Sequence, residues 1–244
     1  MNSKKRIPKI NNDSPLNPTN WIVSATSERF TYKAETDRPW KPETILELLE
    51  QAHQEFERRM GPGLDTVIEV EDRICEPNNL GARAEINKQI HSPQDFTIEV
   101  KFICEFPPNY GHTEQERNLA YHFFVHELFH CWIGGNVSND HGQIVEAITQ
   151  YMTDWTLVHL GYCSEDLLVR GQINSQQIIE TAPPPHTTIA KYKLLFHQMH
   201  TDNPKNLLAF CRDLATCFRQ QRSREETDIS PILQRYLGTV LEEG

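Results

Sequence analysis

Alternating apolar and polar residues mark several short stretches in the first half of the chain. Within residues 29–35 (RFTYKAE), Phe30, Tyr32 and Ala34 alternate with polar residues, which is typical of a half-buried strand. Similar stretches follow at residues 66–71, 82–88 and 97–104. The pattern therefore predicts that a mixed β-sheet forms in the N-terminal half.

A helical spacing of apolar residues lies between the first two of these stretches. Pro42 stands where a helix can begin, and apolar residues then recur at intervals of three and four from Ile45 to Met60. Gly61 and Pro62 end the run. We expect this helix to pack on the sheet.

The character of the chain changes at Thr113, where apolar residues become dense. Thr113 and Glu116 have the spacing of a capping box, in which each side chain accepts a hydrogen bond from the backbone of the other residue. No glycine or proline then interrupts the sequence until Gly134 and Gly135. A long helix is predicted, and it must be central and buried, since apolar residues cover most of its circumference. These residues are Leu119, Phe123, Phe124, Val125, Leu128, Phe129, Trp132 and Ile133.

A second helix is expected to follow directly. Asp140 and Gln143 can cap its start, Gly161 ends it, and its apolar face runs from Ile144 to Val158. The rest of the chain is helical in pattern. It comprises a proline-rich loop at residues 181–188 and helices at about 189–200, 204–220 and 231–242.

Together these patterns predict an α+β fold in one domain over residues 21–244, with the sheet in about 21–112 and the helical part in about 113–244. A length of 244 residues is sufficient for one core of this size. Residues 1–20 are polar, contain proline and lack periodicity, so we expect a flexible tail without chemistry.

Charge and cysteine content restrict the partners. The formal net charge of -10 and the pI near 5.6 oppose binding to phosphate backbones and to anionic membranes, so neither nucleic acid nor membrane is expected. No long apolar run and no signal-peptide segment is evident. Six cysteines without a C-x-x-C pair indicate buried thiols in a reducing compartment, which favours the cytoplasm. No oligomeric state is indicated.

The candidate chemistry lies at residues 126–136, HELFHCWIGGN, inside the long helix. His126 and His130 are four residues apart, so both imidazoles project from one face of the helix, as two ligands of a tetrahedral zinc do. Glu127 lies to the side of the pair, where it can take a proton from a water at the metal. The alternative is a chance match, in which both histidines are core residues. The metal site is favoured, because unpaired polar groups on a buried helix are costly.

A catalytic zinc needs a third protein ligand and an open position. Glu146 is the first candidate, since it lies on the apolar side of the next helix, one turn past its N-cap, and that helix must fold back on the first. His141 is the rival, at the helix start, where a side chain more often faces solvent. A third histidine in the H-x-x-G-x-x-H arrangement is excluded, because Ile133 and Asn136 occupy the glycine and histidine positions.

The segments FFVHELFHCWIGGNV and IVEAITQYM resemble the H-E-L-x-H-x-W-x-G-N-x-V and W-x-x-E-G-F-x-x-Y segments of the gluzincin aminopeptidases. This group includes leukotriene A4 hydrolase and the glycyl aminopeptidases. The likeness is specific over about residues 120–155. It implies a thermolysin-like fold and one zinc ion held by His126, His130 and Glu146, with Glu127 as the general base. Tyr151 matches a tyrosine five residues after the glutamate ligand.

The chain also departs from the family pattern. The spacer between the second histidine and the glutamate is three residues shorter, and Ala147 stands where the family has glycine. In the family, the glutamate of a G-x-M-E-N stretch holds the substrate amine. The nearest counterpart here is LGARAEI, with Gly81, Ala82 and Glu85. An exopeptidase specificity is therefore not supported.

The resemblance implies a role for a tyrosine as well. The family has a tyrosine on a later helix that donates a hydrogen bond to the oxyanion, and Tyr192 lies in a comparable place after the proline-rich loop. An ordinary helix aromatic is the alternative. Tyr110 and Tyr236 are further candidates.

Other polar residues stand at helical intervals from the candidate ligands. His122 precedes His126 by four residues and could serve a second metal, but a polar lining of the cleft or a satisfied core histidine is favoured. Gln150 and Asp154 lie one and two turns beyond Glu146, and either could orient a ligand imidazole.

The expected function is that of a zinc-dependent, metallopeptidase-like hydrolase acting on a peptide or small-molecule substrate. One alternative is a zinc enzyme of the same fold that acts on a non-peptide, for example by opening an epoxide or closing a ring. The other is a binding module without catalysis. An intact H-E-x-x-H opposes the binding module, which has no reason to keep a buried general base.

Overall fold

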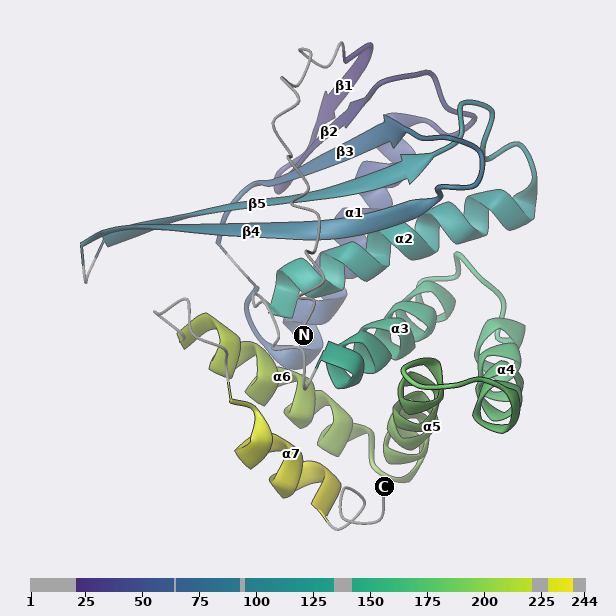
Figure 1. Cartoon of the computed structure of the whole chain (residues 1–244). Coiled ribbons are helices and arrows are strands. Elements are labelled where there is room, and N and C mark those ends of the chain that lie inside the picture. The colour runs from purple at the N-terminus through teal and green to yellow at the C-terminus, as the bar shows by residue number, and fades with distance from the viewer. Residues whose placement is uncertain (1–20, 64, 93–94, 134–141, 221–227, 239–244) are drawn as a thin grey trace, which may run out of the picture.

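The computed structural model describes residues 21–63, 65–92, 95–133, 142–220 and 228–238. They contain five strands and seven helices, with the strands on one side of the molecule and most helices in a lobe on the other (Figure 1). The strands are β1 (Val23–Thr26), β2 (Phe30–Ala34), β3 (Ile68–Ile74), β4 (Gly81–Ser92) and β5 (Asp95–Phe106). The helices are α1 (Pro42–Met60), α2 (Glu114–Ile133), α3 (Gly142–His159), α4 (Asp166–Thr181), α5 (His186–Asp202), α6 (Pro204–Gln220) and α7 (Ser230–Leu237). The fold is α+β, as predicted.

The five strands form one mixed sheet in the order β1-β2-β3-β5-β4. Strands β2, β3 and β5 are parallel, and Phe30, Ile68 and Val100 stand opposite one another across them. The antiparallel neighbours β1 and β4 flank this parallel centre. The predicted mixed sheet is confirmed, and β4 is an edge strand among the described residues.

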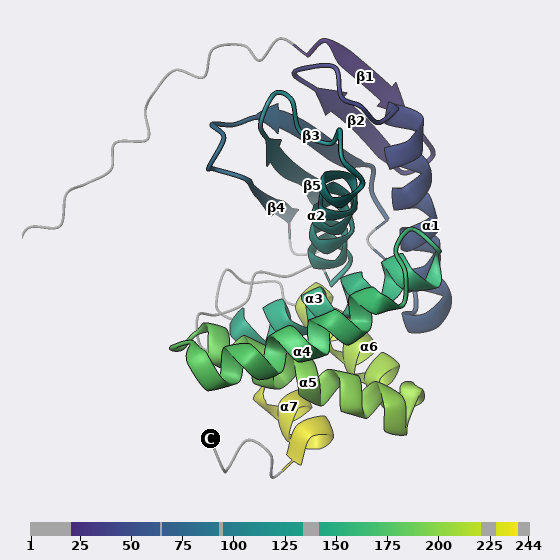
Figure 2. The same cartoon turned by 90° about the vertical axis from the view of Figure 1, so that its right-hand side faces the viewer.

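Helices α1 and α2 cover the same face of this sheet. Helix α1 packs against β1 and β2, α2 packs against β4 and β5, and the two helices contact each other (Figure 2). Alternate residues of β2, which are Phe30, Tyr32 and Ala34, are buried beneath them. The helix predicted from Pro42 is therefore present and packs on the sheet, and a second helix shares that face.

Helix α2 is central because it is enclosed on two sides. The sheet covers one side, while α3 and α6 pack on the other. Its aromatic residues interlock with those of α1, with the ring centroids of Phe56 and Phe129 lying 5.1 Å apart. Its first turns reach solvent, where Leu119 is 40 % exposed, whereas most residues from Phe124 onward are buried. The expectation of a buried helix thus holds over most of its length.

The capping box at the start of α2 forms as predicted. The backbone N–H of Glu116 donates to Thr113 Oγ1 at 3.1 Å, and the backbone N–H of Thr113 donates to Glu116 Oε2 at 3.0 Å. We expect Thr113→Ala to lower the free energy of unfolding by about 1 kcal/mol, because a helix N–H group loses its partner. Urea unfolding measures this change.

A matched control for this variant is Thr216→Ala. Thr216 is exposed on α6 and bonds only the carbonyl of Arg212 in its own helix, so its loss should change stability by less than about 0.5 kcal/mol. If Thr113→Ala costs no more than Thr216→Ala, the capping box does not stabilise α2.

Several predicted boundaries were wrong. The short strand β1 was not predicted, and β4 and β5 extend further toward their connecting turn than expected. Helix α5 begins at His186, inside the segment assigned to a loop, so that only residues 182–185 separate it from α4. Helix α7 ends at Leu237, since Gly238 adopts a positive φ of 48°. The proposed tail at residues 1–20 and the proposed cap at Asp140 lie outside the described residues.

Candidate metal centre

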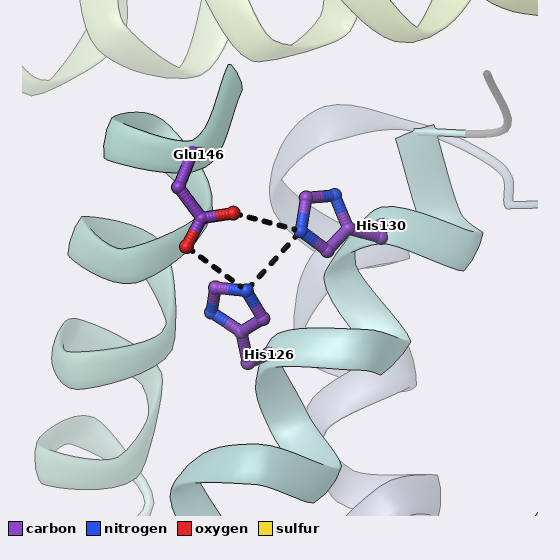
Figure 3. Close-up of side chains that lie close together, drawn as sticks. All are labelled: His126, His130 and Glu146. Carbon is purple, nitrogen blue, oxygen red and sulfur yellow. Dashed lines mark hydrogen bonds and ion pairs between the residues drawn. The ribbon is translucent and has the colours of Figure 1, made fainter. Parts of the chain in front are cut away.

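Three side chains from α2 and α3 converge where the two helices pack side by side (Figure 3). His126 and His130 project from α2 one turn apart, and Glu146 projects from the second turn of α3. The two Nε2 atoms of the histidines are 3.2 Å apart. The carboxylate of Glu146 places one oxygen 3.4 Å from His126 Nε2 and the other 3.4 Å from His130 Nε2. The structure therefore brings together the three residues that the sequence proposed as ligands.

The spacing of these atoms is close to that around one cation. Zinc binds histidine nitrogen and carboxylate oxygen at about 2.0–2.1 Å, so the ligand atoms of a tetrahedral site lie about 3.3–3.4 Å from one another. Here each Glu146 oxygen lies 3.4 Å from a different Nε2 atom, and one ligand atom from each of the three residues lies within 4.8 Å of the others. Without a cation, both Nε2–H groups can donate to Glu146, but the two donors then oppose each other at 3.2 Å. A shared cation removes this conflict. The donor set thus fits zinc, with two imidazoles and one carboxylate.

The electrostatic setting of the trio also favours ligation. Burial lowers the pKa of His126, which keeps the imidazole neutral, as a ligand must be. Burial acts to raise the pKa of Glu146, but the hydrogen bonds from His126 and His130 lower it well below its ordinary range. His126 Nδ1 is buried and has no hydrogen-bond partner in the described part of the chain, so no hydrogen bond there orients the ring.

Glu127 is the buried carboxylate next to this trio. It is 4 % exposed, and burial raises its pKa to about 7. The charge of His130 and the backbone N–H of Ala84 on β4 act in the opposite sense and lower this pKa. Glu127 therefore lines the cavity beside the candidate ligands, but it is not one of the three residues whose ligand atoms converge.

A cavity of about 630 Å³ opens over the trio and Glu127. Its walls come from the edge strand β4 and from helices α2 and α3. The residues that line it are Ala82, Arg83, Ala84, Ile86, His122, Phe123, His126, Glu127, His130, Gly142, Val145, Glu146 and Gln150. The resemblance points to the segment LGARAEI, residues 80–86, without singling out Arg83 or Ala84, and four residues of this segment line the cavity.

Solved structures with a similar fold include M1 zinc metallopeptidases and an aminopeptidase N family protein. An M1 zinc metallopeptidase from Deinococcus radiodurans aligns with a TM-score of 0.53 at 10% identity, over 91% of this chain and 49% of that one. An aminopeptidase N family protein from Idiomarina loihiensis gives a TM-score of 0.53 at 11% identity, over 88% and 46%. A mutant of the Deinococcus radiodurans enzyme bound to the substrate Tyr-Ser-Ala gives 0.50 at 10% identity, over 92% and 49%.

The chain has the fold of the M1 zinc metallopeptidases. It spans about half the length of these structures. No protein-family model and no curated protein matches the sequence. The likeness is therefore one of fold, and it agrees with the resemblance to gluzincin aminopeptidases at that level.

Glu85 is the nearest sequence counterpart of the glutamate that, by the family resemblance, would hold a substrate amine. It does not line the cavity. Its carboxylate lies 3.2 Å from Lys101 Nζ and 3.3 Å from Arg83 Nε. Glu85 is therefore occupied in ion pairs of the sheet.

The tyrosines proposed for the oxyanion do not line the cavity either. Tyr192 is half-buried on α5, and its ring stacks on Phe196. Tyr110 stacks on a sheet residue, and Tyr236 donates a hydrogen bond to Asp213 at 2.9 Å. The role of Tyr192 stays a prediction. The rival ligand, His141, lies outside the described residues.

Tyr151 and Gln150 follow Glu146 along α3. The Tyr151 hydroxyl hydrogen-bonds His200 Nδ1 at 2.8 Å, so it ties α3 to α5. Gln150 Nε2 donates to Glu146 Oε1 at 2.9 Å, so this amide orients the carboxylate and not an imidazole. We expect Gln150→Ala to weaken zinc binding about tenfold, because outer partners of ligands hold them in place. Competition with a chromogenic chelator measures the affinity.

The control for Gln150→Ala is Gln198→Ala. Gln198 forms the same kind of i, i+4 hydrogen bond on α5, with Asp202 at 2.7 Å, away from the cavity. Equal zinc affinities for the two variants would show that the Gln150 hydrogen bond does not support the site.

Within the described residues, no helix combines the length and the apolar character that a membrane span requires.

Proposed function

We propose that the chain is a zinc-dependent hydrolase of the metallopeptidase type. The observation that carries this proposal is the convergence of His126, His130 and Glu146 within 4.8 Å of one another, beside the buried Glu127 and beneath an open cavity. Zinc held there would supply Lewis acidity for a carbonyl and lower the pKa of a water molecule in its open position. The hydrolytic chemistry of the M1 structures supports the same reading by fold alone.

In this proposal Glu127 is the general base. It takes a proton from the attacking water and returns it to the leaving group, which requires a carboxylate next to the reacting atoms and out of bulk water. Ala84 of the edge strand lines the cavity beside this carboxylate. His126, His130 and Glu146 hold the metal, and β4 and α3 form the walls that keep the substrate over it.

We propose that the substrate is a peptide and that the site does not bind the free amino terminus of this peptide. The only sequence candidate for an amine anchor, Glu85, is ion-paired outside the cavity. This same observation favours the second candidate function, a zinc enzyme of this fold acting on a non-peptide. All six cysteines are free thiols, and we propose the cytoplasm as the compartment on that ground.

Turnover of peptide amides by the purified, zinc-loaded protein tests the proposal. Fluorogenic peptide amides with free and with blocked amino termini are compared, and blocked substrates should be cleaved at least as well. Addition of 1,10-phenanthroline should abolish cleavage, and excess zinc should restore it. Bound zinc without cleavage of any peptide amide supports the non-peptide alternative. If the protein binds no zinc, the proposal fails and the alternative of a binding module is favoured.

A further inference from the structure

A histidine of the cavity belongs to a cluster that the proposed hydrolysis does not use. His122 lies on α2 one turn before His126, and the two rings stack with their centroids 5.8 Å apart. His122 Nδ1 lies 3.2 Å from Oδ1 of Asp154 on α3. The other oxygen of Asp154 lies 2.6 Å from Lys193 Nζ on α5. The buried carboxylate of Asp154 therefore links α3 to α2 and α5, and its partner His122 lines the cavity.

The Asp154 carboxylate fixes the orientation of the His122 ring. Asp154 is 3 % exposed, and Gly171 of α4 lies over it, since a Cβ there would be 3.6 Å from both Asp154 Oδ2 and Lys193 Nζ. Burial acts to raise the pKa of Asp154, but the hydrogen bond from His122 and the charge of Lys193 lower it. Asp154 Oδ1 lies 3.2 Å from His122 Nδ1, and an ionised carboxylate can only accept, so the ring tautomer that suits this contact carries its proton on Nδ1.

The second ring nitrogen of His122 is left open. No hydrogen bond to Nε2 is found in the described part of the chain. Nε2 is also absent from the buried polar atoms without a partner, so it is accessible to solvent. The side chain is 24% exposed, and it lines the cavity. Lys193 pairs with the other oxygen of Asp154, so His122 is not the only partner of this carboxylate.

We propose that His122 is a substrate-contacting residue, whose Nε2 accepts a hydrogen bond from an amide N–H group of the bound peptide. This inference rests on the proposed function and assigns a residue that sets substrate orientation. Asp154 is the positioning residue, because it holds the tautomer that leaves the acceptor facing the cavity. If His122 only linked α2 to α3, its contact through Nδ1 with Asp154 would be sufficient, and the accessible Nε2 would have no role.

The first test is the tautomer of His122 in the zinc-loaded protein. Two-bond ¹H–¹⁵N correlation spectra of labelled histidines distinguish the Nδ1–H form from the Nε2–H form, and His122→Ala assigns the signals. We expect the Nδ1–H form. In Asp154→Asn, the side-chain NH₂ can donate to Nδ1, so the tautomer should reverse. An Nε2–H form in the native protein overturns the proposal, since that nitrogen could not accept.

The second test uses a zinc-binding probe with and without the amide donor. A blocked dipeptide hydroxamate is compared with its singly N-methylated derivatives by calorimetry. In the native protein, loss of the contacting N–H should weaken binding about tenfold, the worth of one hydrogen bond. In His122→Ala, N-methylation at that position should make no difference. An equal cost of N-methylation in both proteins overturns the proposal.

The zinc affinity of the same samples distinguishes failure of the proposed zinc site from failure of the proposed role of His122. His122→Ala should bind zinc as the native protein does, and so should the control His186→Ala, which replaces an exposed histidine at the start of α5. A native protein without bound zinc refutes the proposed function. Bound zinc, together with a His122→Ala variant in which the cost of N-methylation is unchanged, refutes only the role of His122.

Discussion

Glu127→Gln should retain one bound zinc ion and lose at least about a thousandfold in kcat, because general acid–base groups contribute roughly 10²–10⁴ and this residue acts in two proton transfers. The amide has the size of the carboxylate but cannot take a proton. Glu127 is 4 % exposed and is not part of the converging trio, so its replacement leaves the ligand atoms in place. The kcat is measured on the best peptide amide, and the zinc content by mass spectrometry.

Glu105→Gln is the matched control for this variant. This substitution also removes one negative charge near the cavity. The Glu105 carboxylate lies 2.9 Å from the guanidinium of Arg83, a lining residue, but Glu105 itself does not line the cavity. It should keep nearly full activity. A Glu127→Gln protein with bound zinc and native turnover would remove the general base from the mechanism. Loss of zinc from it would instead make Glu127 a ligand.

The fold was predictable where local signals and tertiary packing agree. Pro42 and the Thr113 capping box begin helices in the sequence and in the structure, because capping and proline geometry act within one turn. The alternation in β2 matches a strand with one buried face. The placement of α2 at the centre followed from its apolar circumference, which only a sheet and a helical lobe together can cover.

The errors fall where long-range contacts override local pattern. Strand β1 has four residues that alternate between half-buried and exposed and none that is buried, so its pairing with β2 supplies what the sequence does not show. Strands β4 and β5 pair further than predicted through a polar stretch around residue 90, because each supplies the hydrogen-bond partners of the other. Helix α5 begins at His186 directly after the prolines, whose fixed φ suits a helix start.

The candidate site divides in the same way. The pairing of His126 with His130 needs only helical spacing, and the structure has both imidazoles on one face. The position of Glu146 needed the further assumption that α3 folds back on α2. Tyr192 was assigned by family resemblance alone, and it does not line the cavity. The contact of His122 with Asp154 depends on the packing of two helices, which no sequence spacing reports.

Removal of the Glu146 carboxylate should weaken zinc binding at least about 100-fold, more than the loss of an outer partner of a ligand does. Glu146→Ala removes one of three converging ligands, and Glu146→Gln keeps its size and loses its charge. The side chain is 33% exposed, so both variants should fold. Chelator competition gives the affinity, and the zinc-induced rise in melting temperature, which the native protein should show, should disappear in Glu146→Ala.

His141→Ala decides between the two candidates for the third ligand. If Glu146 binds the metal, His141→Ala keeps native affinity, since the distances of 3.4 Å from Glu146 to both imidazoles already complete the set. If His141→Ala loses zinc while Glu146→Ala keeps it, Glu146 only accepts hydrogen bonds from His126 and His130. The chemistry would then rest on three histidines, and the shorter spacer between the helices would mark a different ligand set from the one that the family resemblance implies.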